Sequence, residues 1–274
     1  MSGRRDVLAR IAAALERLSP PLSPPVDWLS APAYLWSDTQ AMAIERIEAP
    51  ALEVLRGIDG QKQAVTDNLA RLSQGAAAHD MLLWGARGMG KSALIRSACA
   101  DLFESGSGDL GLVQVGAEGL STLPQLIQTL AQHERAYLLF IDDLGFDECD
   151  TAENFALRSV LDGGVIARPG NIRLAVTSNR RAIVQRDAND TAALHERDER
   201  DNALALADRF GLTLAFHPCD QDTYFEIISA YTQPLGMDFS EEEAAAWALA
   251  RGNRSGRTAY QFACEIAGRA GLKL

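Results

Sequence analysis

The sequence is poor in the features that mark membrane, secreted and metal-binding proteins. No apolar run approaches the ~18 residues that a membrane span needs, and the N-terminus lacks an apolar leader with a small-residue cleavage site. The four cysteines and four histidines are scattered and show neither a CxxC pattern nor metal-ligand spacing. We therefore expect a cytoplasmic protein without a membrane span, in which the cysteines are reduced packing or surface thiols.

Positive charge is also scarce. The formal net charge is −11, and only three of the 26 basic residues are lysines. Because a protein that coats nucleic acid must neutralise phosphates, this balance argues against that class, although it leaves a local basic stripe open. With 274 residues, of which 47% are hydrophobic, the chain suits one large domain or a core with a small appendage.

The N-terminal part of the chain has the pattern of a separate arm. Residues 4–18 show the spacing of an amphipathic helix, and the proline-rich residues 19–25 end it as an extended linker. The apolar stripe of this helix comprises Val7, Leu8, Ile11, Leu15 and Leu18. The stripe docks either on the parent domain or on a partner or neighbouring subunit.

From residue 50 onward, short apolar runs alternate with helical patterns. Strands are expected at 81–84, 112–115, 136–141, 172–177 and 212–216. Helices are expected at 91–103, 121–132, 151–162, 220–233, 240–250 and 256–270. Apolar runs separated by helices indicate an α/β fold with a five-stranded parallel sheet between helices. We expect this nucleotide-binding domain to span 26–217 and a small helical lid domain to span 218–274.

The first expected strand leads into a loop with the pattern GxxxxGK[ST], formed by Gly85-Ala86-Arg87-Gly88-Met89-Gly90-Lys91-Ser92. In this pattern the glycines let backbone N–H groups turn inward around phosphates, at the N-terminus of a helix. Lys91 is expected to reach the β- and γ-phosphates, and the Ser92 hydroxyl is expected to bind magnesium. For this composition the motif occurs by chance about 0.002 times, so we prefer an ATP and Mg²⁺ site to a structural glycine turn.

The third expected strand ends in two carboxylates, Asp142 and Asp143. The first suits a place beside magnesium, held through water or through Ser92. The second suits the residue that orients or deprotonates the attacking water, but an aspartate is shorter than the usual glutamate by about 1.5 Å. We therefore expect slow hydrolysis, with ATP binding alone as the alternative.

A group of acids follows this strand: Asp147, Glu148 and Asp150. They suit the capping of the helix expected from residue 151, and Glu148 is a second candidate for the base. The charge-dense residues 186–201 have the pattern of a solvated loop or surface helix.

Two further polar residues, Asn179 and Arg209, lie next to the ends of expected strands. Asn179 follows the fourth strand, where it would face the γ-phosphate and the attacking water, or alternatively cap a turn. Arg209 precedes the fifth strand, where it would act as an arginine finger on the γ-phosphate of a neighbouring subunit, or alternatively pair with Asp208.

A glycine-rich turn with three arginines, Arg251, Arg254 and Arg257, precedes the last expected helix. Ser255 is expected to cap this helix, which places Arg257 in its first turn. Because the helix dipole opposes a cation there, an anion such as a bound triphosphate should compensate it.

With these motifs, the chain resembles AAA+ ATPases over residues ~50–274. The matching elements appear in order as Walker A at 85–92, Walker B at 137–143, sensor 1 at Asn179, the arginine finger at Arg209 and sensor 2 at Arg257 or Arg254. The resemblance also implies that Ile58 packs on the adenine base. More narrowly, strings such as LLWGARGMGKSALI and FIDDLGFDE resemble a family of bacterial AAA+ ATPases catalogued as a domain of unknown function.

Three functions are compatible with these motifs. The first is an oligomeric, Mg²⁺-dependent ATPase, a homo-oligomer that remodels a protein or nucleic-acid partner. The second is a molecular switch that binds ATP with negligible turnover, which the shorter Asp143 favours. The third, a small-molecule kinase, would need an acceptor pocket and a lid inserted in the core, and neither is visible.

Overall fold

The computed structural model describes residues 26–144, 157, 160–161, 169–179 and 207–274. The predicted arm at 1–25, the acids at 147–150 and the loop at 186–201 lie outside this part of the chain. Of the helix expected at 151–162, only Leu157, Val160 and Leu161 are described, and these three are helical.

A seven-stranded sheet forms the centre of the protein, in the order β2-β1-β4-β5-β6-β3-β7. Every neighbouring pair is parallel except β1 and β2. The strands are β1 Ala33–Ser37, β2 Gln40–Ile44, β3 Met81–Gly85, β4 Leu110–Val115, β5 Ala136–Ile141, β6 Ile172–Ser178 and β7 Leu212–Phe216. The five expected strands are therefore present, at nearly the expected positions.

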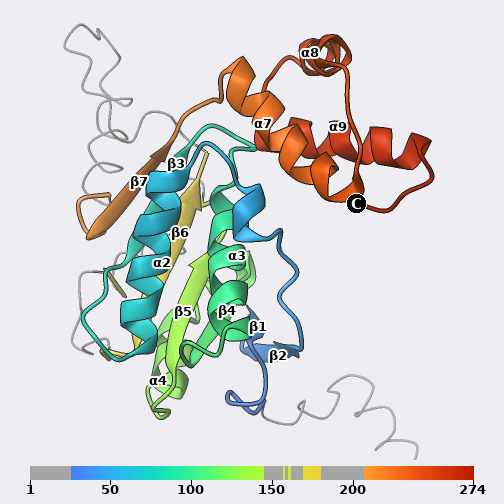
Figure 1. Ribbon diagram of the computed structural model, residues 1–274. Helices are drawn as coiled ribbons and strands as arrows, with labels where there is room; N and C mark the ends of the chain where they lie inside the picture. Colours follow the sequence, from blue (N-terminus) through green and yellow to red (C-terminus); the bar gives the residue numbers. More distant parts are fainter. Residues whose placement is uncertain (1–25, 145–156, 158–159, 162–168, 180–206) are drawn as a thin grey trace, which may run out of the picture.

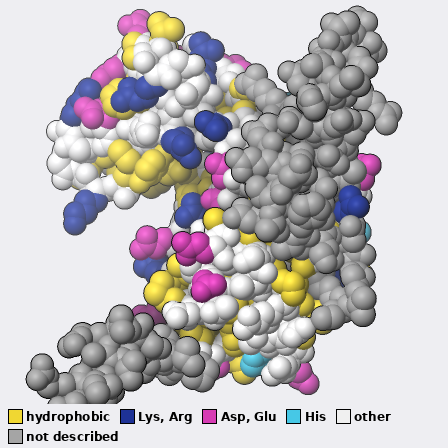
Figure 2. Space-filling view, turned by 180° about the vertical axis from the view of Figure 1, so that it is seen from behind, with side chains coloured by type: hydrophobic (Ala, Val, Ile, Leu, Met, Phe, Trp, Pro, Cys, Tyr) yellow, Lys and Arg dark blue, Asp and Glu magenta, His cyan; other side chains and the backbone are white. Residues whose placement is uncertain are grey.

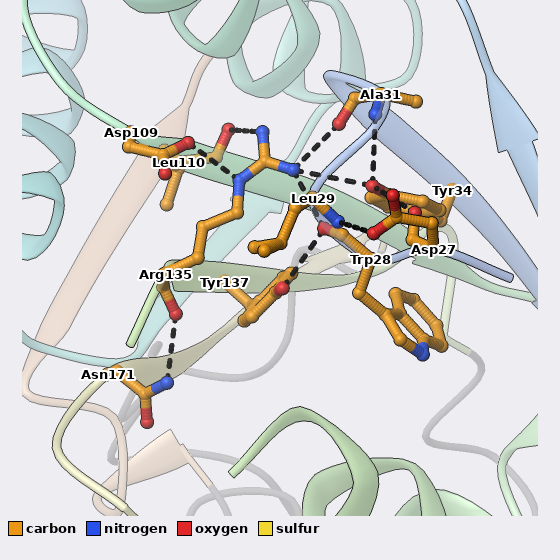
Figure 3. A network of polar contacts seen from close by, with 10 residues as sticks. All are labelled: Asp27, Trp28, Leu29, Ala31, Tyr34, Asp109, Leu110, Arg135, Tyr137 and Asn171. Atoms are coloured by element: carbon orange, nitrogen blue, oxygen red, sulfur yellow. Dashed lines mark hydrogen bonds and ion pairs between the residues drawn. The ribbon is translucent and has the colours of Figure 1, made fainter. Parts of the chain in front are cut away.

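The expected strand number was wrong, because a hairpin of β1 and β2 extends the sheet beyond β4. Its strands have only five residues each, and the tight turn between them uses Asp38 with a φ of 54° rather than a glycine. Burial pins β1 to the sheet, since Tyr34 and Trp36 are 1% and 4% exposed. Figure 3 shows how Arg135, just before β5, holds the chain ahead of β1 through the carbonyl oxygens of Trp28 and Ala31, at 2.9 and 2.8 Å.

Helices cover both faces of the sheet (Figure 1). On one face α2 Asp59–Ser73 and α3 Lys91–Glu104 pack against alternate strand residues, and on the other α4 Leu123–Leu130 does so. The helix α2 was missed in the sequence, although Val65, Leu69 and Leu72 lie on one helical face and are fully buried. The described part also contains short 3₁₀ helices, which are η1 Leu52–Val54, η2 Ala117–Gly119 and η3 Gln233–Leu235.

Beyond β7 the chain forms a helical lobe with a hydrophobic cluster of its own. Its helices are α7 Gln221–Thr232, α8 Glu241–Ala250 and α9 Gly256–Arg269. Side chains of Asp220, Ser240 and Ser255 cap their N-termini. Figure 1 shows this lobe above the carboxyl ends of the strands, which is where open parallel sheets bind ligands.

The described helices are all too short or too polar to cross a membrane.

Candidate functional site

The glycine-rich loop lies between the end of β3 and the start of α3. Gly85 has a φ of 123°, and a Cβ there would lie 2.2 Å from the carbonyl oxygen of Phe216 on β7. Gly88 and Gly90 have φ values of 74° and 87°, which residues with a side chain rarely adopt. The loop therefore depends on its glycines, and it ends at a helix N-terminus, whose dipole favours an anion.

Lys91 is the first residue of α3 and is 6% exposed. Its Nζ donates to three oxygens: Gly85 O at 3.0 Å, Ala86 O at 2.8 Å and Asn179 Oδ1 at 2.9 Å. Burial is the main cause that lowers the pKa of Lys91 to about 8, and the charges of Asp143 and Asp142 partly offset it. An anion bound in the loop would further favour the charged ammonium.

Asp142 joins the end of β5 to the loop and to β6. Its Oδ1 accepts hydrogen bonds from Ser92 Oγ at 2.5 Å and from Thr177 Oγ1 at 2.6 Å. Because Ser92 donates its proton to the carboxylate, the lone pairs of its oxygen stay available. A hydroxyl and a carboxylate oxygen side by side are ligands that Mg²⁺ prefers, so these two residues fit that ion.

Asp143 has an uncommon backbone conformation for a residue with a side chain, with a φ of 55°. Its N–H donates to Thr177 Oγ1 at 2.8 Å, and its Oδ1 accepts a hydrogen bond from the Asn179 amide. Asn179 therefore contacts both Lys91 and Asp143. The cation of the loop and the second carboxylate of β5 share one amide.

The helical lobe reaches the loop through the start of α9. The Arg257 N–H donates to Gly88 O at 3.0 Å, and the Ser255 side chain caps α9 by accepting from Thr258 N at 3.2 Å. A Cβ on Gly88 would lie 2.8 Å from Ser255 Oγ, so only glycine allows this approach. Arg257 is in the first turn of α9, as the capping pattern predicted.

A cavity of about 640 Å³ lies between the sheet domain and the helical lobe. Its polar lining residues include Lys91, Ser92, Asp142, Asp143, Asn179 and Arg257. Its apolar and aromatic lining residues include Leu55, Ile58, Ile227, Tyr231 and Tyr260. Figure 2 shows the hollow between the two lobes, with hydrophobic side chains on the underside of the upper lobe and charged side chains of both signs beside it. A ligand that carries both an apolar ring and phosphates fits a lining of these two kinds.

Comparisons with known proteins identify the family and the fold of this chain. A protein family described as "protein of unknown function (DUF815)" matches residues 29–270. The chain belongs to this family. No curated protein matches it significantly in sequence.

Solved structures show which fold the family member has. A variant of RuvB from Thermotoga maritima has a TM-score of 0.52 and 18% identity, over 82% of this chain and 68% of that one. The ORC1 protein of Aeropyrum pernix, in complex with DNA, has a TM-score of 0.55 and 16% identity, over 83% and 66%. Both are AAA+ P-loop ATPases, so this DUF815 chain has the AAA+ fold and the predicted fold class is confirmed.

Most of the residues singled out in the sequence lie together. The loop residues Gly88, Met89, Gly90, Lys91 and Ser92, with Ile58, Asp142, Asp143, Asn179 and Arg257, line the cavity. The carbonyl oxygens of Gly85 and Ala86 accept hydrogen bonds from Lys91, but these two residues do not line the cavity. Arg87 is exposed in the loop. Arg209 and Arg254 are exposed and are not among the described residues that line the cavity.

Sequence reasoning missed three kinds of residue around the cavity. Thr177 carries the hydrogen bonds between Asp142 and Asp143, and Tyr231 and Tyr260 contribute aromatic wall from the helical lobe. Arg56 and Arg96 line the cavity as additional cations. Thr177 could have been found in the sequence. It lies two positions before Asn179, and side chains two positions apart along a strand point to the same side.

Proposed function

We propose that the protein binds ATP with Mg²⁺ and hydrolyses it slowly. The observation that supports this most directly is the chain of contacts from Lys91 through Asn179 to Asp143, and from Ser92 to Asp142, along the wall of one cavity. This arrangement puts a cation, a hydroxyl–carboxylate pair and a second carboxylate within reach of one ligand.

Each residue then has a stated task. The loop N–H groups and Lys91 bind the phosphates, Arg257 adds positive charge from the lobe, and Ile58 contacts the base. Ser92 and Asp142 would hold Mg²⁺, and the bound ion would neutralise charge that develops on the phosphate oxygens. Asp143 orients the attacking water, with its carboxylate positioned by Asn179.

We further propose that hydrolysis requires a neighbouring subunit of a homo-oligomer. Arg209 supports this, because it is an exposed arginine before β7, outside the cavity of its own chain. In a ring or other ATP-dependent assembly it would contact the γ-phosphate bound by the next subunit. The conformational change would then remodel a protein or nucleic-acid partner, as an AAA+ machine does.

The test combines kinetics and assembly. Wild type, Arg209→Ala and Arg46→Ala are compared by ATP turnover and by sedimentation with and without ATP. Arg46 is the matched control, since it is exposed and does not line the cavity. We expect the Arg209 variant to bind ATP normally and to lose turnover by on the order of 10³-fold. A wild type that stays monomeric with ATP, or an Arg209 variant with full turnover, would refute the shared site.

A second candidate function is a nucleotide switch with negligible turnover. The observation that favours it is the Asp143 carboxylate, which is short and is already bonded to Asn179. Single-turnover kinetics separate the two functions. Turnover faster than roughly one per minute counts against a pure switch, whereas efficient phosphoryl-transfer enzymes reach ~1–100 per second.

The partner is best sought in the ATP-bound state. Bound proteins and nucleic acid are compared between Asp143→Asn, which should bind ATP without hydrolysing it, and Lys91→Ala, which should bind ATP much more weakly. Macromolecules held by the first variant and absent from the second are candidate substrates.

A further inference from the structure

We infer that Thr177 is a positioning residue, which sets the places of Asp142 and Asp143 through a single hydroxyl. Thr177 would thereby control the affinity for Mg²⁺ and the rate of hydrolysis through these two acids. The inference rests on the proposed ATPase function and adds a residue to it.

The hydroxyl lies between the two acids. Thr177 is the last residue but one of β6 and is 1% exposed. Its Oγ1 donates to Asp142 Oδ1 at 2.6 Å and accepts from the Asp143 N–H at 2.8 Å. The Thr177 carbonyl also accepts from Leu144 N at 2.9 Å. One residue of β6 therefore binds three consecutive residues at the end of β5.

The direction of these bonds determines what the hydroxyl does. A hydroxyl has one proton, and here it goes to Asp142. The same Asp142 oxygen accepts the Ser92 proton, so Ser92 and Thr177 together fix the orientation of the carboxylate. Since Mg²⁺ demands near-ideal geometry, a carboxylate held from two sides is prepared for the ion before the ion arrives.

As a hydrogen-bond acceptor, the Thr177 hydroxyl positions Asp143. Asp143 has a φ of 55°, in the left-handed region, which costs an L-residue roughly 1–2 kcal/mol. The hydrogen bond from its N–H to Thr177 stabilises this conformation. With the backbone so turned, the Asp143 carboxylate reaches the Asn179 amide. A valine would keep the shape of Thr177 but could neither donate to Asp142 nor accept from Asp143.

A buried threonine can also be purely structural, and the chain offers a matched control. Thr232 is likewise 1% exposed, and its hydroxyl has no hydrogen-bond partner among the described residues. Thr232→Val therefore removes a buried hydroxyl of the same kind away from the acids. If Thr177 is only structural, Thr177→Val should change the stability of the protein alone. If Thr177 positions the acids, the substitution should also change how nucleotide binding depends on Mg²⁺.

The experiment compares wild type, Thr177→Val, Thr177→Ser and Thr232→Val in the full chain. Binding of a fluorescent ATP analogue is measured without Mg²⁺ and across a Mg²⁺ titration, together with kcat and KM. For Thr177→Val we expect affinity without Mg²⁺ within about twofold of wild type, because the phosphate loop is intact. The Mg²⁺ concentration for half-maximal binding should rise about tenfold, and kcat should fall about tenfold with KM nearly unchanged, as expected for the loss of a hydrogen bond to a charged group.

Rescue separates the hydroxyl from the fold. Thr177→Ser should restore most of the Mg²⁺ affinity and of kcat, and Thr232→Val should behave as wild type. If Thr177→Val does not fold, Thr177→Ser is compared with Thr177→Ala, since those two differ by the hydroxyl alone. The role of Thr177 would be overturned if an active wild type and Thr177→Val had the same Mg²⁺ dependence and kcat, or if Thr177→Ser and Thr177→Ala did. The proposed function would then still stand. A wild type that binds no nucleotide would instead overturn both.

Discussion

Two buried cations, Lys91 and Arg135, lie at the carboxyl and amino ends of the parallel strands of the sheet. Lys91 contacts the carboxyl ends of β3 and β6 and is 6% exposed, and Arg135 precedes β5 and is 5% exposed. Both donate to backbone carbonyls. They differ in what surrounds the charge, and that difference distinguishes a cation suited to binding an anion from a structural cation.

Oxygen atoms from five residues surround the Arg135 guanidinium (Figure 3). Its guanidinium donates to Trp28 O, Ala31 O, Tyr34 Oη and Leu110 O, and its Nε lies 2.8 Å from Asp109 Oδ1. A planar fork of donors suits several fixed acceptors at once. Arg135 therefore ties the segment before β1 to the starts of β4 and β5.

Lys91 has fewer fixed partners and an open side. Two carbonyls and one amide oxygen hold it, and the cavity begins beside it. Its lowered pKa shows that the chain alone does not fully compensate its burial. A buried cation at a cavity wall, whose burial the chain compensates only in part, is prepared for an anion, whereas a cation enclosed by fixed acceptors stabilises the fold.

The largest effect should come from Arg135→Met. The substitution leaves several buried carbonyls without donors, so we expect the free energy of unfolding to fall by about 3 kcal/mol. Urea unfolding followed by circular dichroism measures it. Arg46→Met is the control and should change the value by less than ~0.5 kcal/mol. A loss under about 1 kcal/mol for Arg135→Met would contradict the structural role, and the folded variant should still bind ATP.

Lys91→Met should weaken ATP binding and leave the stability of the protein nearly unchanged. We expect ATP affinity to fall about 30- to 100-fold, because charge-assisted hydrogen bonds to the phosphates are lost. The free energy of unfolding without nucleotide should change by less than about 1 kcal/mol, since the substitution also removes a desolvated charge. Calorimetric titration with ATP and urea unfolding measure the two quantities.

Lys62→Met is the matched lysine control for this prediction. Lys62 pairs with Asp59 at 2.7 Å and does not line the cavity. It should therefore leave ATP affinity unchanged. If Lys91→Met destabilised the protein as much as Arg135→Met, the two cations would be alike and the comparison would fail.

The smallest effect concerns pH. Lys91 has a pKa of about 8 in the free protein, so it loses its proton as the pH rises through that value. Since ATP binds the charged form, affinity should fall by up to about tenfold for each pH unit above 8, and binding should take up a proton. Calorimetry at pH 8.5 in buffers with different ionisation enthalpies detects that proton.

Lys91→Arg tests the assignment, because arginine stays charged throughout this range. Its ATP affinity should depend less on pH between 8 and 9.5 than that of wild type. Equal pH dependence in the two proteins would show that another group titrates.

Much of the fold was predictable because its signals are local. Apolar runs marked β3 to β7, and Ser255 marked the start of α9. The β1–β2 hairpin was missed because five-residue strands joined through Asp38 carry no strong local signal. Its stability comes from distant partners such as Arg135, which a pattern search along the chain does not detect.

The glycine-rich loop, the acid pair and Asn179 could be found from the sequence alone. The turns of the loop need glycine at positive φ, and the polar residues follow apolar strands at the edge where parallel sheets bind ligands. Only the tertiary structure decided what they contact. The pairing of β5 with β6 brings Thr177 to the acids, and the packing of the lobe brings Arg257 to Gly88. These contacts depend on which strands become neighbours and where the lobe docks, which is set by burial over the whole molecule rather than by local sequence.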